Sequence, residues 1–264
     1  MLKIGFIGCG NMGGALATAA AKSECEIYLA DFCKEKAETL AKELSAVAAN
    51  NNEIAENCGF IFLGVKPQVL EELLTEIAPI LKARKDRFTL VSMAAGVSCE
   101  KIASVLGAQY PIIRIMPNTP VAVGGGMILY TLYGATQEDE KAFLSFMSAA
   151  GRFDNLPEKL IDAGSALSGC GPAFVCQFIE ALADGAVAAG LPREKALLYA
   201  AATLEGTAHL MSETGRHPAE LKDSVCSPGG STIEGVRRLE QGAFRADVID
   251  AVIAAYQRTK ELGK

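Results

Sequence analysis

Two glycine-rich turns carry the residue types best suited to holding a negatively charged small molecule. The first turn, Gly8-Cys9-Gly10-Asn11-Met12-Gly13, follows an apolar run that ends at Ile7 and precedes a segment with helical spacing. Glycines at this spacing make a tight turn, let the backbone approach a pyrophosphate and allow close contact between helix and strand. Amides at the start of a helix favour phosphate charge. The pattern predicts a dinucleotide site, and a glycine-rich turn without a ligand is the alternative.

The second turn, Ser227-Pro228-Gly229-Gly230-Ser231-Thr232, also runs into a helical segment. It presents several backbone amides without helical partners, and such amides suit a carboxylate even without an arginine. The alternative is a plain helix cap, with Ser231 or Thr232 as the N-cap residue. Both interpretations can hold together, because the glycines beside the cap leave room for a ligand.

An acidic residue follows the first turn at the distance expected for a ribose contact. Asp31 ends the second strand-like run, about 20 residues after the first glycine. A carboxylate there accepts from the 2′-hydroxyl of the adenine ribose, which favours NAD and repels a 2′-phosphate. Lys34 and Lys36 follow closely and could instead pair with a 2′-phosphate, and Asp31 could simply cap the next helix. The choice between NAD and NADP stays open.

The elements that must position the first turn alternate between strand-like and helix-like patterns. Short β-rich runs lie at 3–7, 26–30, 60–65, 88–92 and 111–116. Helical patterns lie between them at 11–22, 34–44, 68–80 and 99–106, and runs at 126–130, 137–150 and 152–155 complete the domain. This alternation predicts an α/β, Rossmann-type domain with a parallel-rich sheet and helices on both faces.

Two later segments stand at the ends of predicted strands. Val65-Lys66-Pro67 ends one strand, and Ala94-Ala95-Gly96 follows another. Ligands of open α/β sheets bind beyond the carboxyl ends of the strands, so both segments should border the cofactor. Lys66 as an ordinary surface lysine is the alternative.

After Pro157 the pattern becomes helical. Helices are expected at 172–189, 192–213, 218–225, 232–241 and 244–262, with Pro at first positions and Gly at ends. The segment 172–189 is apolar on nearly all sides, and a small helical domain cannot bury it alone. We therefore predict a Rossmann domain at residues 1–157, an all-helical dimerisation domain at 158–264, and a homodimer formed through the latter.

Composition narrows the classes of function. The 264 residues carry a net charge of −6 with scattered basic residues, which argues against a nucleic-acid partner. The longest charge-free stretch, 115–137, is broken by prolines and glycines, so no membrane segment is expected. The eight cysteines form no C-x-x-C pair and no cluster with either histidine, which predicts reduced thiols and no metal site. No targeting segment is visible, so we expect a cytoplasmic protein.

The second turn and the order of the other motifs resemble the pyrroline-5-carboxylate reductase family. Residues 221–234, LKDSVCSPGGSTIE, are similar to its signature. Further segments match in order: FIGCGNM at 6–12, VKP at 65–67, AAGV at 94–97, MPNTP at 116–120 and SGCGPA at 168–173. The likeness spans almost the whole chain.

The resemblance implies hydride transfer from NADPH or NADH to the cyclic imine 1-pyrroline-5-carboxylate, giving L-proline in the last step of proline biosynthesis. A higher homo-oligomer, such as a decamer, stays open beside the predicted homodimer. The resemblance also implies that residues 229–232 hold the substrate, with Thr232 near the ring nitrogen. The expected cofactor residues are Ile7, Gly8, Cys9, Gly10, Asn11, Met12, Asp31, Asn51, Gly64, Val65, Lys66, Pro67, Ala94, Ala95, Gly96 and Asn118.

The chain departs from the family pattern at two places. Cys170 stands where serine is usual, and Asp31-Phe32 replace small hydroxyl residues near the 2′-phosphate.

The expected reaction needs few acidic side chains, because a protonated imine is already a strong electrophile. We expect the Thr232 hydroxyl to contact the ring nitrogen, while His209 and His217 are structural.

Two other classes of function compete with this reading. β-Hydroxyacid dehydrogenases pair a similar first domain with a helical one, but carry G-x-G-x-x-x-Lys at the start of a long helix. Here Gly169 and Gly171 are followed by Val175 in the place of that lysine, which argues against alcohol oxidation. A non-catalytic nucleotide-binding protein is the third reading, and the intact turn at 227–232 argues against it.

Overall fold

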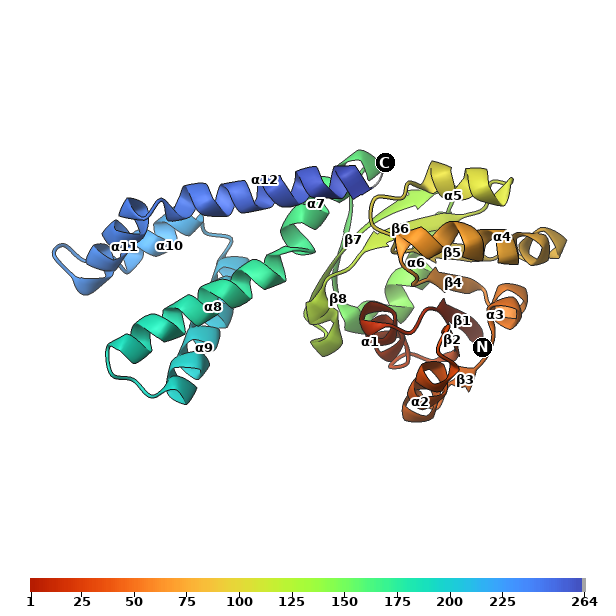
Figure 1. The fold of residues 1–264 in the computed structure, drawn as a ribbon, viewed down its shortest axis with the longest axis horizontal. Coiled ribbons are helices and arrows are strands. Elements are labelled where there is room, and N and C mark those ends of the chain that lie inside the picture. Colours follow the sequence, from red (N-terminus) through yellow and green to blue (C-terminus); the bar gives the residue numbers. More distant parts are fainter. Residues whose placement is uncertain (263–264) are drawn as a thin grey trace. The chain divides into compact units, whose positions relative to one another are not determined.

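The computed structural model describes residues 1–262 of the chain (Figure 1). They form two compact units. The first holds residues 1–170 and the part of the last helix from Ala255, and the second holds Gly171–Ala254. The predicted domain boundary lies 13 residues earlier, after residue 157, and groups the helix at 158–168 with the second domain instead. The last two residues of the predicted second domain, 263 and 264, lie outside the described residues.

The first unit is built on one eight-stranded sheet. Its strands are β1 Leu2–Ile7, β2 Cys25–Ala30, β3 Val47–Ala48, β4 Phe60–Leu63, β5 Thr89–Ser92, β6 Ile112–Met116, β7 Gly126–Tyr133 and β8 Gly151–Asn155. Their order is β3-β2-β1-β4-β5-β6-β7-β8. The strands from β3 to β6 pair in parallel, β7 runs antiparallel to β6, and β8 pairs in parallel with β7. The prediction of a parallel-rich α/β sheet is confirmed.

Parallel pairing brings the carboxyl ends of several strands to one edge of the sheet. Ile7 lies beside both Ala30 and Leu63, and Leu63 lies beside Ser92. The chain leaves β1 towards β2 on one side and returns to β4 on the other. In sheets of this kind a ligand crevice opens at such a reversal, beyond the carboxyl ends of the strands.

Helices cover both faces of the sheet (Figure 1). They are α1 Asn11–Ala20, α2 Lys34–Leu44, α3 Asn51–Asn57, α4 Pro67–Ala83, α5 Cys99–Leu106, α6 Gln137–Phe146 and α7 Glu158–Ser168, with 3₁₀ turns η1 Thr119–Val123 and η2 Ser148–Ala150. One core joins α1, α2 and α6 to the sheet, where the rings of Phe6 and Phe62 stack 4.3 Å apart beside Phe143. A second core joins α3, α4 and α5 to the other face. Burying each such large apolar side chain contributes about 1.5–3 kcal/mol.

Three strands or helices of the first unit were not expected from the sequence. β3 is a two-residue edge strand, and α3 is a short polar helix that begins after an asparagine run. The Asn50 side chain accepts from the amide of Glu53, whose carboxylate accepts from the amide of Asn50. This capping box is readable in a sequence, and it could have revealed α3. α7 is the third, and the predicted helix at 137–150 ends at Phe146 and continues only as the turn η2.

The second unit is helical, as predicted. It holds α8 Gly171–Ala188, α9 Arg193–Thr214, α10 Pro218–Ser224, α11 Ser231–Gln241 and the first part of α12 Phe244–Leu262. Few of its side chains are buried, whereas Leu198 and Ile249 are 64% and 58% exposed. The helical stretch Glu158–Ala188 is long and apolar enough to span a membrane by length and composition, and 11% of its apolar window is buried. The chain therefore exposes an apolar helical surface that its own residues leave uncovered.

Candidate functional site

The first glycine turn lies at the carboxyl end of β1, and the structure gives its glycines different roles. Gly8 has φ +104°, and a Cβ there would lie 2.5 Å from the carbonyl oxygen of Gly64. A Cβ on Gly13 would lie 2.0 Å from the carbonyl oxygen of Gly8. Nothing lies within 4 Å of a Cβ on Gly10. Two glycines are thus needed for packing of the chain on itself, while the space beside Gly10 is open for a ligand.

The start of α1 suits an anion. Gly10 is its N-cap residue, with no side-chain cap on the first amides, and Asn11 is exposed beside it. Unpartnered amides and the helix dipole favour a phosphate at this end. Cys9 is not a nucleophile here, because burial and the neighbouring Asp31 charge raise the pKa of its thiol to about 12. Its Sγ instead donates to the carbonyl of Ala30 at 3.4 Å.

Asp31 ties this turn to the end of β2. Its Oδ2 accepts from the amide of Cys9 at 2.7 Å, and its Oδ1 accepts from the amide of Cys33 at 2.9 Å. The N-cap residue of α2 is Cys33, without a side-chain cap. The alternative in which Asp31 caps the next helix is therefore wrong, and the carboxylate braces the glycine turn instead.

A hollow of about 400 Å³ opens beside Asp31 at the start of α3. Asn51 lines it together with Asp31, and the Asn51 amide donates to Glu76 Oε2 at 3.1 Å. The structure thus brings together Asp31, expected at the adenine ribose, and Asn51, another of the expected cofactor residues. The short helix α3 achieves this, because its capping box fixes where Asn51 stands.

The segment after β4 packs directly against the first glycine turn. Gly64 donates its amide to the carbonyl of Ile7 at 2.7 Å, and a Cβ on Gly64 would lie 2.7 Å from the carbonyl oxygen of Gly8. Val65 follows half-buried, Lys66 is exposed, and Pro67 opens α4 at a position where a missing amide costs nothing. Residues 64–67 therefore lie at the carboxyl end of β4, next to the first glycine turn, and their contact with the cofactor stays a prediction.

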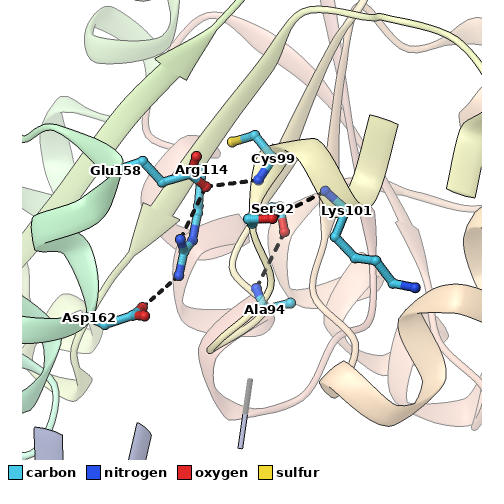
Figure 2. Close-up of polar contacts among 8 residues, drawn as sticks. Ser92, Ala94, Cys99, Lys101, Arg114, Glu158 and Asp162 are labelled. Atoms are coloured by element: carbon cyan, nitrogen blue, oxygen red, sulfur yellow. Dashed lines mark hydrogen bonds and ion pairs between the residues drawn. The ribbon is translucent and has the colours of Figure 1, made fainter. Parts of the chain in front are cut away.

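The segment after β5 is a tight turn of small residues. Ala94 is buried, and its amide donates to Ser92 Oγ at 3.4 Å, as Figure 2 shows. Gly96 has φ +73°, a conformation that favours glycine, and Ala95 lies half-buried between them. Residues 94–96 carry only small side chains or none, so a ligand could approach their backbone closely.

Sequence reasoning missed an ionic cluster behind this turn (Figure 2). Arg114 on β6 is 3% exposed and donates from Nη1 to Glu158 Oε1 at 3.1 Å and from Nη2 to Asp162 Oδ1 at 2.7 Å. Glu158 Oε1 also accepts from the amide of Cys99, at the start of α5, at 2.8 Å. The cluster joins α7 and α5 to the sheet. A lone arginine inside an apolar strand, with acidic residues four apart on a later helix, is the signal that could have found it.

The Asn118 side chain forms two hydrogen bonds within the first unit. Its Nδ2 donates to the carbonyl of Ser168 at 2.9 Å, and its Oδ1 accepts from the amide of Met127 at 2.9 Å. The side chain is 9% exposed and joins the end of α7 to the start of β7. This arrangement favours a positioning role for Asn118 over direct cofactor contact through its side chain.

The second glycine turn starts α11 in the other unit. Gly229 has φ +68°, and Gly230 is the N-cap residue without a side-chain cap. The alternative that Ser231 or Thr232 caps this helix is therefore wrong. Ser231 and Thr232 are exposed, and the first amides of an 11-residue helix are left without side-chain partners. Such an end can hold a carboxylate, with the Thr232 hydroxyl beside it.

The two histidines lie away from both glycine turns along the chain. His217 caps α10, where its Nδ1 accepts from the amide of Ala219 at 3.2 Å, and His209 lies exposed within α9. Among residues 1–262, no three His, Cys, Asp or Glu side chains are grouped to hold a metal.

Comparison with known proteins matches both halves of the chain. Residues 158–262 match the family model described as pyrroline-5-carboxylate reductase dimerisation, and residues 3–96 match one described as NADP oxidoreductase, coenzyme F420-dependent. The pyrroline-5-carboxylate reductases of Escherichia coli (strain K12) and Arabidopsis thaliana are each 41% identical to it over 99% of this chain, and over 98% and 96% of their own lengths. The crystal structure of Plasmodium falciparum pyrroline carboxylate reductase with NADP bound has a TM-score of 0.89 and 31% identity, covering 100% of this chain and 98% of that one. This chain belongs to the pyrroline-5-carboxylate reductase family.

Proposed function

We infer that this protein reduces 1-pyrroline-5-carboxylate to L-proline with NADH or NADPH. Full-length similarity to pyrroline-5-carboxylate reductases carries this inference, together with the open space at Gly10 where a pyrophosphate would lie. Bound reduced nicotinamide supplies the hydride for the carbon of the C=N bond, and the ring nitrogen retains a proton. The protein's task is then to bind, orient and exclude water, which can be worth about 7–11 kcal/mol in well-aligned cases.

The cofactor site proposed for this chain follows the edge of the sheet. The amides of residues 10–12, at the start of α1, hold the pyrophosphate, since no side chain caps that helix, whereas the amides of Gly8 and Cys9 already donate to Ala30 and Asp31. Asp31 and Asn51 take the adenosine end, where they line one hollow. Residues 64–67 and 94–96 line the nicotinamide half, with Asn118 as a positioning residue behind them.

The substrate site proposed for this chain is the start of α11. Residues 229–232 hold the substrate carboxylate through the first amides of α11, those of Ser231 and Thr232, which Gly230 leaves without a side-chain cap. The Thr232 hydroxyl is the hydrogen-bond partner of the ring nitrogen. Val175 occupies the place of the lysine that alcohol dehydrogenation would need, which favours imine reduction over the dehydrogenase alternative.

A homodimer through the helical unit accounts for the exposed apolar surface. Val175, Leu198 and Ile249 of this unit are 47%, 64% and 58% exposed, and exposed apolar patches mark interaction surfaces. A mostly apolar groove of about 540 Å³ on α8, α11 and α12, lined by Phe174, Phe178 and Val248 among others, lies on this surface. A dimer would cover the apolar helices without a membrane. Light scattering during gel filtration measures the mass of the assembly, and would reveal the dimer or a larger assembly such as a decamer.

The free state of all eight cysteines suits the reducing cytoplasm.

One assay tests the function. It measures the loss of reduced-nicotinamide absorbance, with NADH and with NADPH, on adding 1-pyrroline-5-carboxylate and, in parallel, its six-membered analogue. Oxidation that depends on the imine is expected. A folded protein that binds either cofactor but oxidises neither would contradict the reductase function and leave the two alternatives, a β-hydroxyacid dehydrogenase or a non-catalytic nucleotide-binding protein.

A further inference from the structure

The Asp31 carboxylate is fixed at the edge of the adenosine hollow. Both of its oxygens are held by backbone amides, one from the glycine turn and one from the turn after β2, at 2.7 and 2.9 Å. The carboxylate therefore cannot turn away from a ligand without losing a hydrogen bond. An ionised carboxylate has about four acceptor positions, so each oxygen keeps one for a further donor.

The charges around this hollow are mainly negative. Asp31, Glu38, Glu53 and Glu76 line it, against the single lysine Lys34. No arginine is among its lining residues, all of which belong to the described part of the chain. Arginine is the residue that commonly accommodates a 2′-phosphate in this fold, because its planar fork matches phosphate oxygens.

The lysines that follow Asp31 offset this charge only weakly. Lys34 and Lys36 are both exposed, and Lys36 lines a neighbouring hollow that also holds Glu35 and Glu43. An exposed ammonium on a flexible stem contributes little to binding, since water and salt screen it.

We propose that Asp31 makes this enzyme select NADH over NADPH. The proposal rests on the proposed function, which places the adenosine end of the dinucleotide in this hollow. The ribose hydroxyls of NADH donate to the free acceptor positions of Asp31. The 2′-phosphate of NADPH offers no donor when fully ionised, and adds roughly −1.5 to −2 of charge beside a carboxylate that cannot move.

Direct binding tests this without the imine substrate. The full-length protein is titrated with NADH and with NADPH, and the nicotinamide fluorescence gives both dissociation constants. We expect NADH to bind at least about tenfold more tightly, which corresponds to about 1.4 kcal/mol. Asp31→Asn removes the charge at nearly constant size, and should move the ratio of the two constants towards NADPH by roughly 10- to 100-fold.

The ratio of the two dissociation constants is the decisive quantity. A loosened glycine turn would weaken the binding of NADH and NADPH alike, because the two cofactors differ only in the 2′-phosphate. Glu38→Gln is the matched control, since it removes a carboxylate of the same hollow that is not held at the end of β2, and its ratio should stay within about threefold of wild type. Equal affinity of the wild type for both cofactors, or an unchanged ratio in Asp31→Asn, would overturn the proposal. Tight NADH binding without imine reduction would sink the proposed function and leave this selectivity standing.

Discussion

Replacing Arg114 with methionine tests whether the buried ionic cluster holds α5 and α7 to the sheet of the first unit. The guanidinium pairs with Glu158 and Asp162, and its side chain is 4% exposed. Methionine fills a similar space without charge. The variant leaves two carboxylates, four residues apart on α7, facing the sheet without their cation.

The size of the expected loss in stability follows from how deeply the charged side chains of the cluster are buried. Removing one partner of a buried ion pair costs about 3–5 kcal/mol. The Glu158 and Asp162 side chains are 30% and 29% exposed, so water screens part of the repulsion between them. We therefore take the lower end of this range, about 3 kcal/mol. Arg114 Nε is also buried without a hydrogen-bond partner in the structure. Removing this unpartnered nitrogen stabilises the fold by roughly 1 kcal/mol. The net loss in the free energy of unfolding is then about 2 kcal/mol.

Thermal unfolding at fixed protein concentration measures this loss. A chain of this size loses roughly 2–4 °C of Tm per kcal/mol, so Arg114→Met should unfold about 4–8 °C below wild type. The triple variant Arg114→Met, Glu158→Gln, Asp162→Asn is the control. It removes all three charges and keeps an acceptor for the Cys99 amide, so most of the Tm should return. A wild-type Tm in the single variant, or no recovery in the triple one, would refute the reasoning.

Three further outcomes are expected. Gly13→Ala places a Cβ 2.0 Å from the Gly8 carbonyl oxygen, so NADH affinity should fall at least about tenfold in fluorescence titration, and wild-type affinity would contradict the packing argument. Thr232→Ala should lower kcat/KM by roughly 10- to 100-fold, about 1.4–2.7 kcal/mol, and an unchanged value would remove Thr232 from the mechanism. Hydrogen bonding from Arg87 lowers the pKa of Asp139 from 3.8 to about 2, so Asp139 stabilises the fold above about pH 4 and this contribution is lost between about pH 4 and 2. Urea titrations across that window should show a shallower acid loss in Arg87→Gln than in wild type, and equal slopes would speak against the pairing.

The glycine turns were predictable because their chemistry is local. A strand, a turn with glycines at fixed spacing and a helix are adjacent in sequence, so Gly8 to Gly13 could be assigned before any fold was known. The strands of the parallel sheet were equally visible, since strands covered on both faces are apolar throughout, as in Phe60–Leu63. Asn50 and Glu53 carry a local signal for α3 as well, because their capping box spans only four residues.

Other features depend on residues that are distant in the chain. Arg114 meets its partners 44 and 48 positions later, and Asn118 bonds to a carbonyl 50 positions away. Periodicity and propensity concern neighbours within a few residues, so neither contact could be expected from them. Asp31 is an intermediate case. Its place at a strand end is local, but only the fold shows that both of its oxygens are held by backbone amides.

The sequence by itself determined the class of fold, the two glycine turns and the family, because each of these is written in short segments of fixed spacing. Tertiary structure alone decided which glycines serve packing and which leaves room for a ligand. It also decided that Asn118 is engaged in bonding distant segments, and that Arg114 anchors α7 and α5 to the sheet. The physical reason is that hydrogen bonds and ion pairs form between groups that are close in space, and only the folded chain brings these groups together.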